Sequence, residues 1–153
     1  MAAYCNAADV RAMLKDDLIN SLLGDQYIRD EEEREQRLLP LIEAAAEDAQ
    51  AEIDGYLAKR YAVPLTRVPK VISKYAKDIA VYNLVSRIGV GTEADREQNY
   101  LERYKFALKY LQLAAAGTVS IGADSESPSA ASATGFQMSG PQRIFSRDRM
   151  RGM

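Results

Sequence analysis

The chain has 153 residues, a formal net charge of -2, 47% hydrophobic residues, one cysteine and no histidine. This balance gives no global basic field for nucleic acid or an anionic membrane, and the size suits one domain plus a tail. The single Cys5 excludes an intrachain disulfide, and the lack of histidine excludes His-based catalysis and His-ligated metal sites.

The N-terminal residues predict two short helices. The start, MAAYCNAADV, lacks the basic region and apolar core of a signal peptide, and no apolar run in the chain is long enough to span a bilayer. Asn6, with Asp9 three residues later, predicts the N-cap of a helix over about 7–14. A second helix is expected over 16–23, where Gly24 ends it. We expect both to pack as a cap on a main bundle.

Three longer helices are predicted next. Asp30 is a good N-cap, and Pro40 is expected to kink the first of them or to separate a short lead-in from a main rod over 41–61. Helices follow over 69–88 and 93–116. Apolar side chains at three- and four-residue spacing predict the core-facing stripes, namely Ala45, Ala49, Ile53, Tyr56, Leu57, Tyr61, Ile72, Tyr75, Ala76, Ile79, Tyr82, Val85, Tyr100, Leu101, Tyr104, Ala107, Leu108, Leu111 and Ala115.

The composition changes at Thr118, after the glycine that ends the last helix. Ser, Ala and Pro then dominate without an apolar period, which indicates a linker. We therefore predict an all-α fold: a small antiparallel bundle of three main helices with short N-terminal helices, over residues 1–117, and an extended C-terminal arm over 118–153. Val119 and Ile121 are candidates for a short strand at the start of the arm.

Acidic side chains crowd the start of the first long helix, where they suit the positive end of the helix dipole. Such a run is typical of a solvated helix start. The alternative is the lining of a channel that repels passing DNA, with the candidate lumen-facing residues Glu31, Glu32, Glu33 and Glu35.

No catalytic, cofactor-binding or metal-binding residue is predicted. The pairs Glu43/Glu47 and Glu47/Asp48 favour a polar helix face over a divalent metal site. Cys5 has no histidine to activate it, so we expect a small packing residue rather than a nucleophile. An enzymatic function is therefore not expected.

The C-terminal segment RIFSRDRMRG interleaves four arginines with Phe145 and Met150. Three interpretations are open: an aromatic–basic segment that binds nucleic acid, an unstructured basic end, or an arm that docks into a neighbouring subunit. In the docking interpretation, Phe145 and Met150 are the anchors and the arginines pair with carboxylates.

Two stretches resemble a known family. Residues 48–69, DAQAEIDGYLAKRYAVPLTRVP, and residues 143–152, RIFSRDRMRG, resemble the Mu-like prophage gp36 family of tailed-phage head–tail connector proteins. The resemblance implies a structural connector (adaptor or head-completion) protein in the neck of the virion, made in the host bacterial cytoplasm. It implies a ring, commonly a dodecamer, beneath the portal.

The resemblance also implies the partners. These are other copies of the chain, the portal protein and a downstream neck or tail-completion protein, with double-stranded DNA passing through the lumen without specific binding and no membrane. It favours docking for the arm, whose interface residues would be Phe136, Arg143, Ile144, Phe145, Arg147, Arg149 and Met150. The alternative function is a helical nucleic-acid-binding packaging or regulatory factor, which needs a basic helix face, whereas the predicted helices alternate in charge sign.

Overall fold

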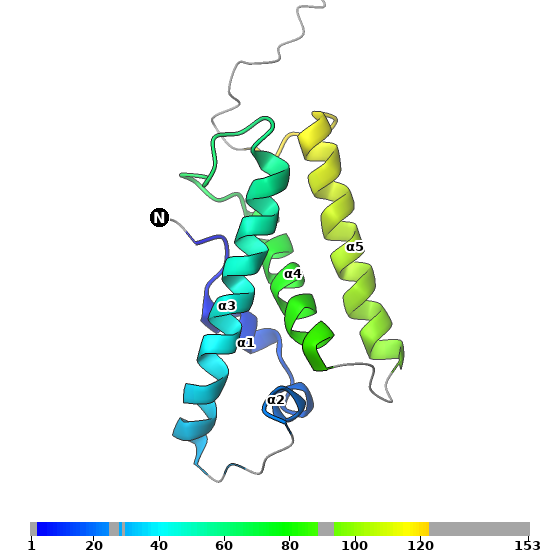
Figure 1. The fold of residues 1–153 in the computed structure, drawn as a ribbon. Helices are drawn as coiled ribbons and strands as arrows, with labels where there is room; N and C mark the ends of the chain where they lie inside the picture. The colour runs from blue at the N-terminus through cyan, green and yellow to red at the C-terminus, as the bar shows by residue number, and fades with distance from the viewer. Residues whose placement is uncertain (1–2, 25–27, 29, 89–93, 123–153) are drawn as a thin grey trace, which may run out of the picture.

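The computed structural model describes residues 3–24, 28, 30–88 and 94–122, with side chains of the last range from residue 98 onward. This part of the chain forms the helices α1 (Ala7–Met13), α2 (Asp16–Leu22), α3 (Glu31–Leu57), α4 (Lys70–Ile88) and α5 (Ala94–Ala116). Figure 1 shows α3, α4 and α5 side by side and alternating in direction. The predicted all-α class is confirmed.

The two short helices form as predicted. The Asn6 side chain caps α1 by accepting a hydrogen bond of 2.8 Å from the Asp9 N–H. After α2, Gly24 turns the chain with a φ of 77°, which suits glycine because it has no Cβ. Helix α1 packs on α3 and α4, and α2 packs on α4 (Figure 1). The buried side chains Val10 and Ile19 join both to the common core.

Pro40 neither divides α3 nor delays its start. The helix begins after Asp30, whose side chain accepts a hydrogen bond from the Glu32 N–H, and runs unbroken to Leu57. A separate rod over 41–61 is therefore wrong. Pro40 lies on the exposed side, while Leu38 and Ile42 on either side of it are buried in one core. Packing of both halves on that core compensates for the hydrogen bond that proline removes.

Helices α4 and α5 begin and end within one residue of the predicted bounds. The end of α5 is a Schellman motif, in which the Gly117 N–H bonds to the Ala114 carbonyl at 3.0 Å and the Thr118 N–H to the Leu113 carbonyl at 2.9 Å. Gly117 has a φ of 82°. The strand considered beyond it does not form: Val119 lies in a bend, and Ile121 is instead buried against the bundle.

The buried residues confirm the predicted stripe of α3, and in α4 they include more positions than the predicted stripe. Five of the six stripe positions from Ala45 to Tyr61 are buried, and Tyr56 is half-buried. Helix α4 also buries residues that the spacing did not predict, because it contacts both α3 and α5; these are Asp78, Ala80, Val81 and Leu84. In α5, Ala107 and Leu111 are buried as expected, but Ala114 is buried where Ala115 was predicted.

Candidate interaction surfaces

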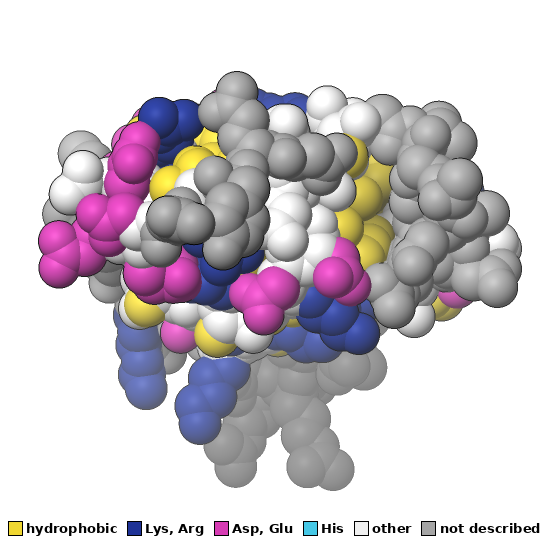
Figure 2. Space-filling view, turned by 90° about the horizontal axis from the view of Figure 1, so that it is seen from below, with side chains coloured by type: hydrophobic (Ala, Val, Ile, Leu, Met, Phe, Trp, Pro, Cys, Tyr) yellow, Lys and Arg dark blue, Asp and Glu magenta, His cyan; other side chains and the backbone are white. Residues whose placement is uncertain are grey.

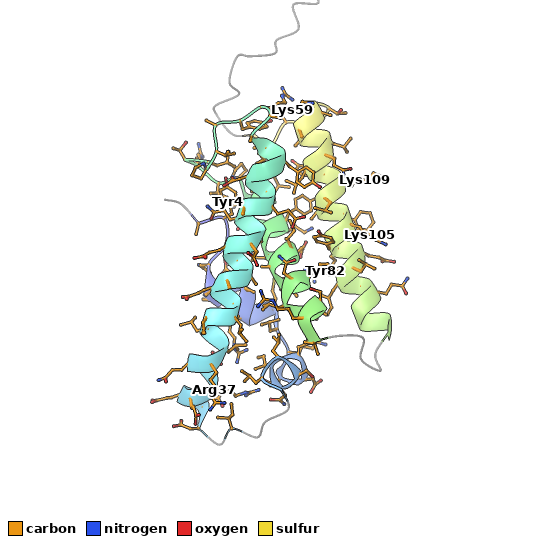
Figure 3. All side chains as sticks on the ribbon, viewed as in Figure 1. Tyr4, Arg37, Lys59, Tyr82, Lys105 and Lys109 are labelled. Carbon is orange, nitrogen blue, oxygen red and sulfur yellow. The ribbon has the colours of Figure 1, made fainter. Side chains whose placement is uncertain are left out.

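A buried tyrosine joins the N-terminal segment to the main helices. The Tyr4 hydroxyl donates a hydrogen bond to the Asp54 carboxylate and accepts one of 2.9 Å from the Leu65 N–H. Figure 3 shows Tyr4 lying against α3. Burial, reinforced by the bond to Asp54, raises the pKa of Tyr4 well above its ordinary value. One hydroxyl thus fixes α3, the chain before α1 and the loop after α3.

Replacing Tyr4 by phenylalanine should destabilise the fold by about 1–3 kcal/mol, because the buried Leu65 N–H loses its partner. The pKa of Tyr4 is raised on folding, so the hydroxyl stabilises fully below about pH 10, where the unfolded tyrosine begins to ionise, and loses this contribution as pH rises further. Urea unfolding should show a deficit at pH 7 that narrows above pH 10. Tyr100→Phe is the control, since the Tyr100 hydroxyl makes no hydrogen bond within the described residues; an equal deficit there would contradict the assignment.

Tyrosines also hold α5 against its neighbours. The Tyr104 hydroxyl donates a 2.9 Å hydrogen bond to Glu52 of α3, and its ring stacks on Tyr82 of α4 with centroids 4.2 Å apart. Burial and the bond to Glu52 raise the pKa of Tyr104 to about 12. A second pair, Tyr75 and Tyr110, joins α4 to α5 with centroids 4.9 Å apart. These contacts set the direction in which the outer faces of α3 and α5 point.

Sequence reasoning missed a buried carboxylate in the same layer. The Asp78 side chain is 1% exposed, accepts a hydrogen bond from the Arg103 guanidinium of α5, and lies 3.5 Å from the Lys74 ammonium. The signal was present, since Asp78 is the one acidic residue of α4 and stands beside the run Ile79-Ala80-Val81. Its role is structural: it pairs α4 with α5.

The acidic start of α3 is largely paired with arginines. Glu31 lies 3.6 Å from Arg34, Glu33 lies 2.6 Å from Arg37, and Glu35 lies 2.8 Å from Arg11 of α1. Figure 2, seen from this end of the bundle, shows acidic side chains interspersed with lysine and arginine side chains. Carboxylates that are paired with arginines repel DNA less strongly than unpaired carboxylates. The lumen-facing role of Glu31, Glu32, Glu33 and Glu35 stays a prediction.

The other candidate chemistries gain no geometric support. Cys5 is buried, and burial raises the pKa of its thiol, which disfavours the reactive thiolate. Within the described ranges, no group of three or more Asp, Glu, Cys or His side chains is arranged to hold a metal ion. Glu43 and Glu47 are exposed on α3, as a polar helix face requires. No helix in the described part is long and apolar enough to cross a membrane.

The outer face of α3 is acidic and partly apolar. One row at four-residue spacing is exposed along its whole length, comprising Leu39, Glu43, Glu47, Ala51 and Gly55. Between residues 38 and 58 the helix contains five acidic side chains (Glu43, Glu47, Asp48, Glu52 and Asp54) and neither lysine nor arginine. A shallow depression lies beside this row, lined by Ala3, Glu47, Gln50, Ala51 and Asp54.

The outer face of α5 carries two lysines and exposed apolar side chains, with the exposed Glu102 one turn before them. Phe106 is 65% exposed and Leu113 is 37% exposed. Lys105 directly precedes Phe106, and Lys109 comes between Phe106 and Leu113 in the sequence. Figure 3 shows both lysines pointing away from α3 and α4. Leu39, at 47%, is the other large apolar side chain that is strongly exposed among the described residues. The exposed large apolar groups of the described bundle therefore lie on the outer faces of α3 and α5.

The predicted arm interface lies outside the residues that the structure describes. This covers the linker from residue 123 onward and the candidates Phe136, Arg143, Ile144, Phe145, Arg147, Arg149 and Met150.

Comparison with known proteins identifies the class of protein. Residues 4–139 match the family described as Bacteriophage Mu, Gp36. The chain is also 29% identical, over 111 residues, to the Mu-like prophage FluMu protein gp36 of Haemophilus influenzae (strain ATCC 51907 / DSM 11121 / KW20 / Rd), which covers 72% of this chain and 74% of that protein.

These matches place the chain among bacteriophage proteins. It belongs to the Gp36 family of bacteriophage Mu. The matched range contains residues 48–69, the first of the two stretches that indicated this family, and ends before the second stretch at 143–152.

Proposed function

We propose that this protein is a structural head–tail connector (adaptor or head-completion) protein of a tailed bacteriophage. It forms a ring beneath the portal and joins the capsid vertex to the neck or tail. The observation that carries this proposal is the family match over residues 4–139, together with the connector role that the resemblance implies. The outer faces of α3 and α5 support it, because exposed apolar groups rimmed by charge are typical of interaction surfaces.

The proposed mechanism is assembly by surface complementarity, without covalent chemistry. The partners are other copies of the chain, the portal protein and a downstream neck or tail-completion protein, and the virion neck is the location. DNA passes through the ring without specific binding. An acidic α3 that lacks lysine and arginine over residues 38–58 agrees with this role and disfavours the alternative of a nucleic-acid-binding factor. That alternative predicts retardation of double-stranded DNA in a gel, falling steeply with salt.

Deleting Gln142–Met153 should leave the bundle folded and abolish its attachment to portal-containing heads. The helices bury a core of their own that includes Leu38, Ile53 and Leu111, whereas the deleted segment has no apolar period. Circular dichroism checks the fold, and co-sedimentation with heads checks attachment. Labelling of intact particles with an antibody checks the location.

Two outcomes would contradict different parts of this account. Unfolding of the truncated chain would show that the segment belongs to the core and that the division into a bundle and an arm is wrong. Antibody labelling away from the neck would exclude the connector role itself. A matched control is the truncation of Met153 alone, which should retain attachment.

A further inference from the structure

We propose that the outer face of α3 binds the C-terminal segment of the same copy, residues 143–152. The bound segment is extended and runs along this face in the opposite direction to α3. Phe145 then lies over the depression at Ala51, Arg147 beside Glu47 and Arg149 beside Glu43. The inference concerns the free chain before any assembly, so it goes beyond the proposed function and does not depend on it.

The α3 face presents two glutamates and a small residue at one regular spacing. Glu43, Glu47 and Ala51 follow one another at four-residue intervals, and all three are exposed. Four residues of an α-helix advance by about 6 Å along its axis. Neither glutamate makes an ion pair within the described part of the chain. Both charges are therefore available to a basic partner.

The C-terminal segment carries complementary side chains at a matching spacing. Phe145, Arg147 and Arg149 follow one another at two-residue intervals. In an extended chain such residues lie on one side, about 6.5 Å apart. A ring and two arginines thus match, in order, Ala51 and the two glutamates that precede it along α3. Asp148, the one acidic residue of the segment, falls on the opposite side, away from the glutamates.

The depression at Ala51 suits the aromatic ring. It is shallow and is lined by Ala3, Glu47, Gln50, Ala51 and Asp54. The short side chains of its two alanines leave room for a ring. An aromatic side chain in a hollow is the usual centre of a contact, and arginine–carboxylate pairs beside it add geometric specificity.

The chain leaves the bundle at the end of α3 from which the proposed direction starts. Ile121 is buried, and its N–H donates a hydrogen bond of 3.5 Å to the hydroxyl of Tyr61, which stands four residues after Leu57. Figure 1 shows the described chain ending beside this end of α3. A segment that continues from there meets Ala51 before Glu47 and Glu43, in the order that the register requires.

The tether favours the same copy over a second one. Residues 123–144 separate Gly122 from Phe145, and a flexible chain of this length spans about 25 Å on average. Ala51 is about 9 Å along the helix axis from Leu57, so it is within reach. Such a tether holds the segment at an effective concentration of about 1 mM near its own face, well above that of other copies in a micromolar solution. The occupant is therefore the segment of the same copy.

Chymotrypsin cleavage after Phe145 tests the contact in the full-length chain, because a bound segment is protected. Mass spectrometry gives the initial rate, which is divided by that of a synthetic peptide of residues 140–153 with the same sequence. The wild-type chain should be cleaved roughly tenfold more slowly than its peptide, as for a contact whose dissociation constant is about tenfold below the effective concentration. The protection should be the same at every protein concentration and should fall as salt rises.

Two charge reversals tie this protection to the α3 face. Glu43→Arg/Glu47→Arg and Arg147→Glu/Arg149→Glu should each lose the protection, because like charges then face each other. The chain with all four changes should recover it, since opposite charges meet again. Each rate is divided by that of the peptide with the same changes, and circular dichroism verifies that each chain is folded.

Glu32→Arg/Glu102→Arg is the matched control, because it reverses two exposed glutamates away from the row and should keep the wild-type protection. An unprotected wild-type chain, protection that survives either reversal, or no recovery with all four changes would overturn the inference. So would protection that grows with protein concentration, which would make a second copy the occupant. None of these results changes where the protein lies in the particle, so antibody labelling of the neck tests the proposed function separately.

Discussion

The Ile53→Asp variant is expected to be unfolded under conditions in which the wild-type chain is folded. Ile53 is fully buried at the centre of the α3 stripe, between Ala49 and Leu57. An unpaired carboxylate there costs several kcal/mol, which is on the order of the whole stability of a small domain. Far-ultraviolet circular dichroism during heating measures the effect, and the variant should show no cooperative transition.

Ala51→Asp provides the matched comparison, because it adds the same side chain two residues away on the exposed face. It should remain folded, with a loss of about 0.5 kcal/mol from helix propensity. A folded Ile53→Asp variant with wild-type melting would mean that the other face of α3 is buried.

Features set by interactions within a few residues could be predicted from the sequence. The Asn6 cap of α1 depends on a hydrogen bond to a backbone group three residues away. The glycine stop of α5 depends on bonds to the carbonyls of Leu113 and Ala114. The α3 stripe follows from helical spacing alone. Each of these features depends on residues within a short window of sequence, which is why it could be predicted. The structure confirms all three.

Features set by the arrangement of helices could not be predicted in this way. Pro40 was expected to kink α3 or to separate a short lead-in from a main rod. The helix is unbroken, because Leu38 and Ile42 on either side of Pro40 are anchored in one core. The α4 stripe was predicted too narrow because spacing shows one face, whereas α4 lies between α3 and α5 (Figure 1). Ala80 and Leu84 are buried for that reason.

The candidate surfaces also combine features that could be predicted from the sequence with features that could not. Exposure of the acidic start of α3 was predictable from its composition, but the pairing of Glu35 with Arg11 links residues on different helices. Sequence also could not show that Lys105, Lys109, Glu43 and Glu47 lack partners within the described bundle. That observation, more than the charges themselves, makes the outer faces of α3 and α5 candidates for assembly.

Removing the arginine that pairs with the buried carboxylate should have the second large effect on stability. Arg103→Met is expected to cost about 3 kcal/mol, because it leaves Asp78 charged and buried without its hydrogen-bond donor. The cost should lie at the lower end for a broken buried pair, since Arg103 is 40% exposed and Lys74 remains 3.5 Å from the carboxylate. Urea unfolding monitored by circular dichroism measures the change in free energy of unfolding.

A second substitution separates loss of the pair from loss of packing. Asp78→Ala/Arg103→Met removes both partners, so it should be more stable than Arg103→Met alone, because no buried charge is left. Arg87→Met is the matched control on α4: its pair with Asp48 spans 3.8 Å between exposed side chains, and the loss should be about 0–1 kcal/mol. Equal losses for Arg103→Met and Arg87→Met, or a double variant less stable than Arg103→Met, would contradict the role of Asp78. The expected order would establish that the Asp78–Arg103 ion pair, together with the tyrosine contacts, holds α5 on α4 and so sets the direction in which the Lys105–Lys109 face points.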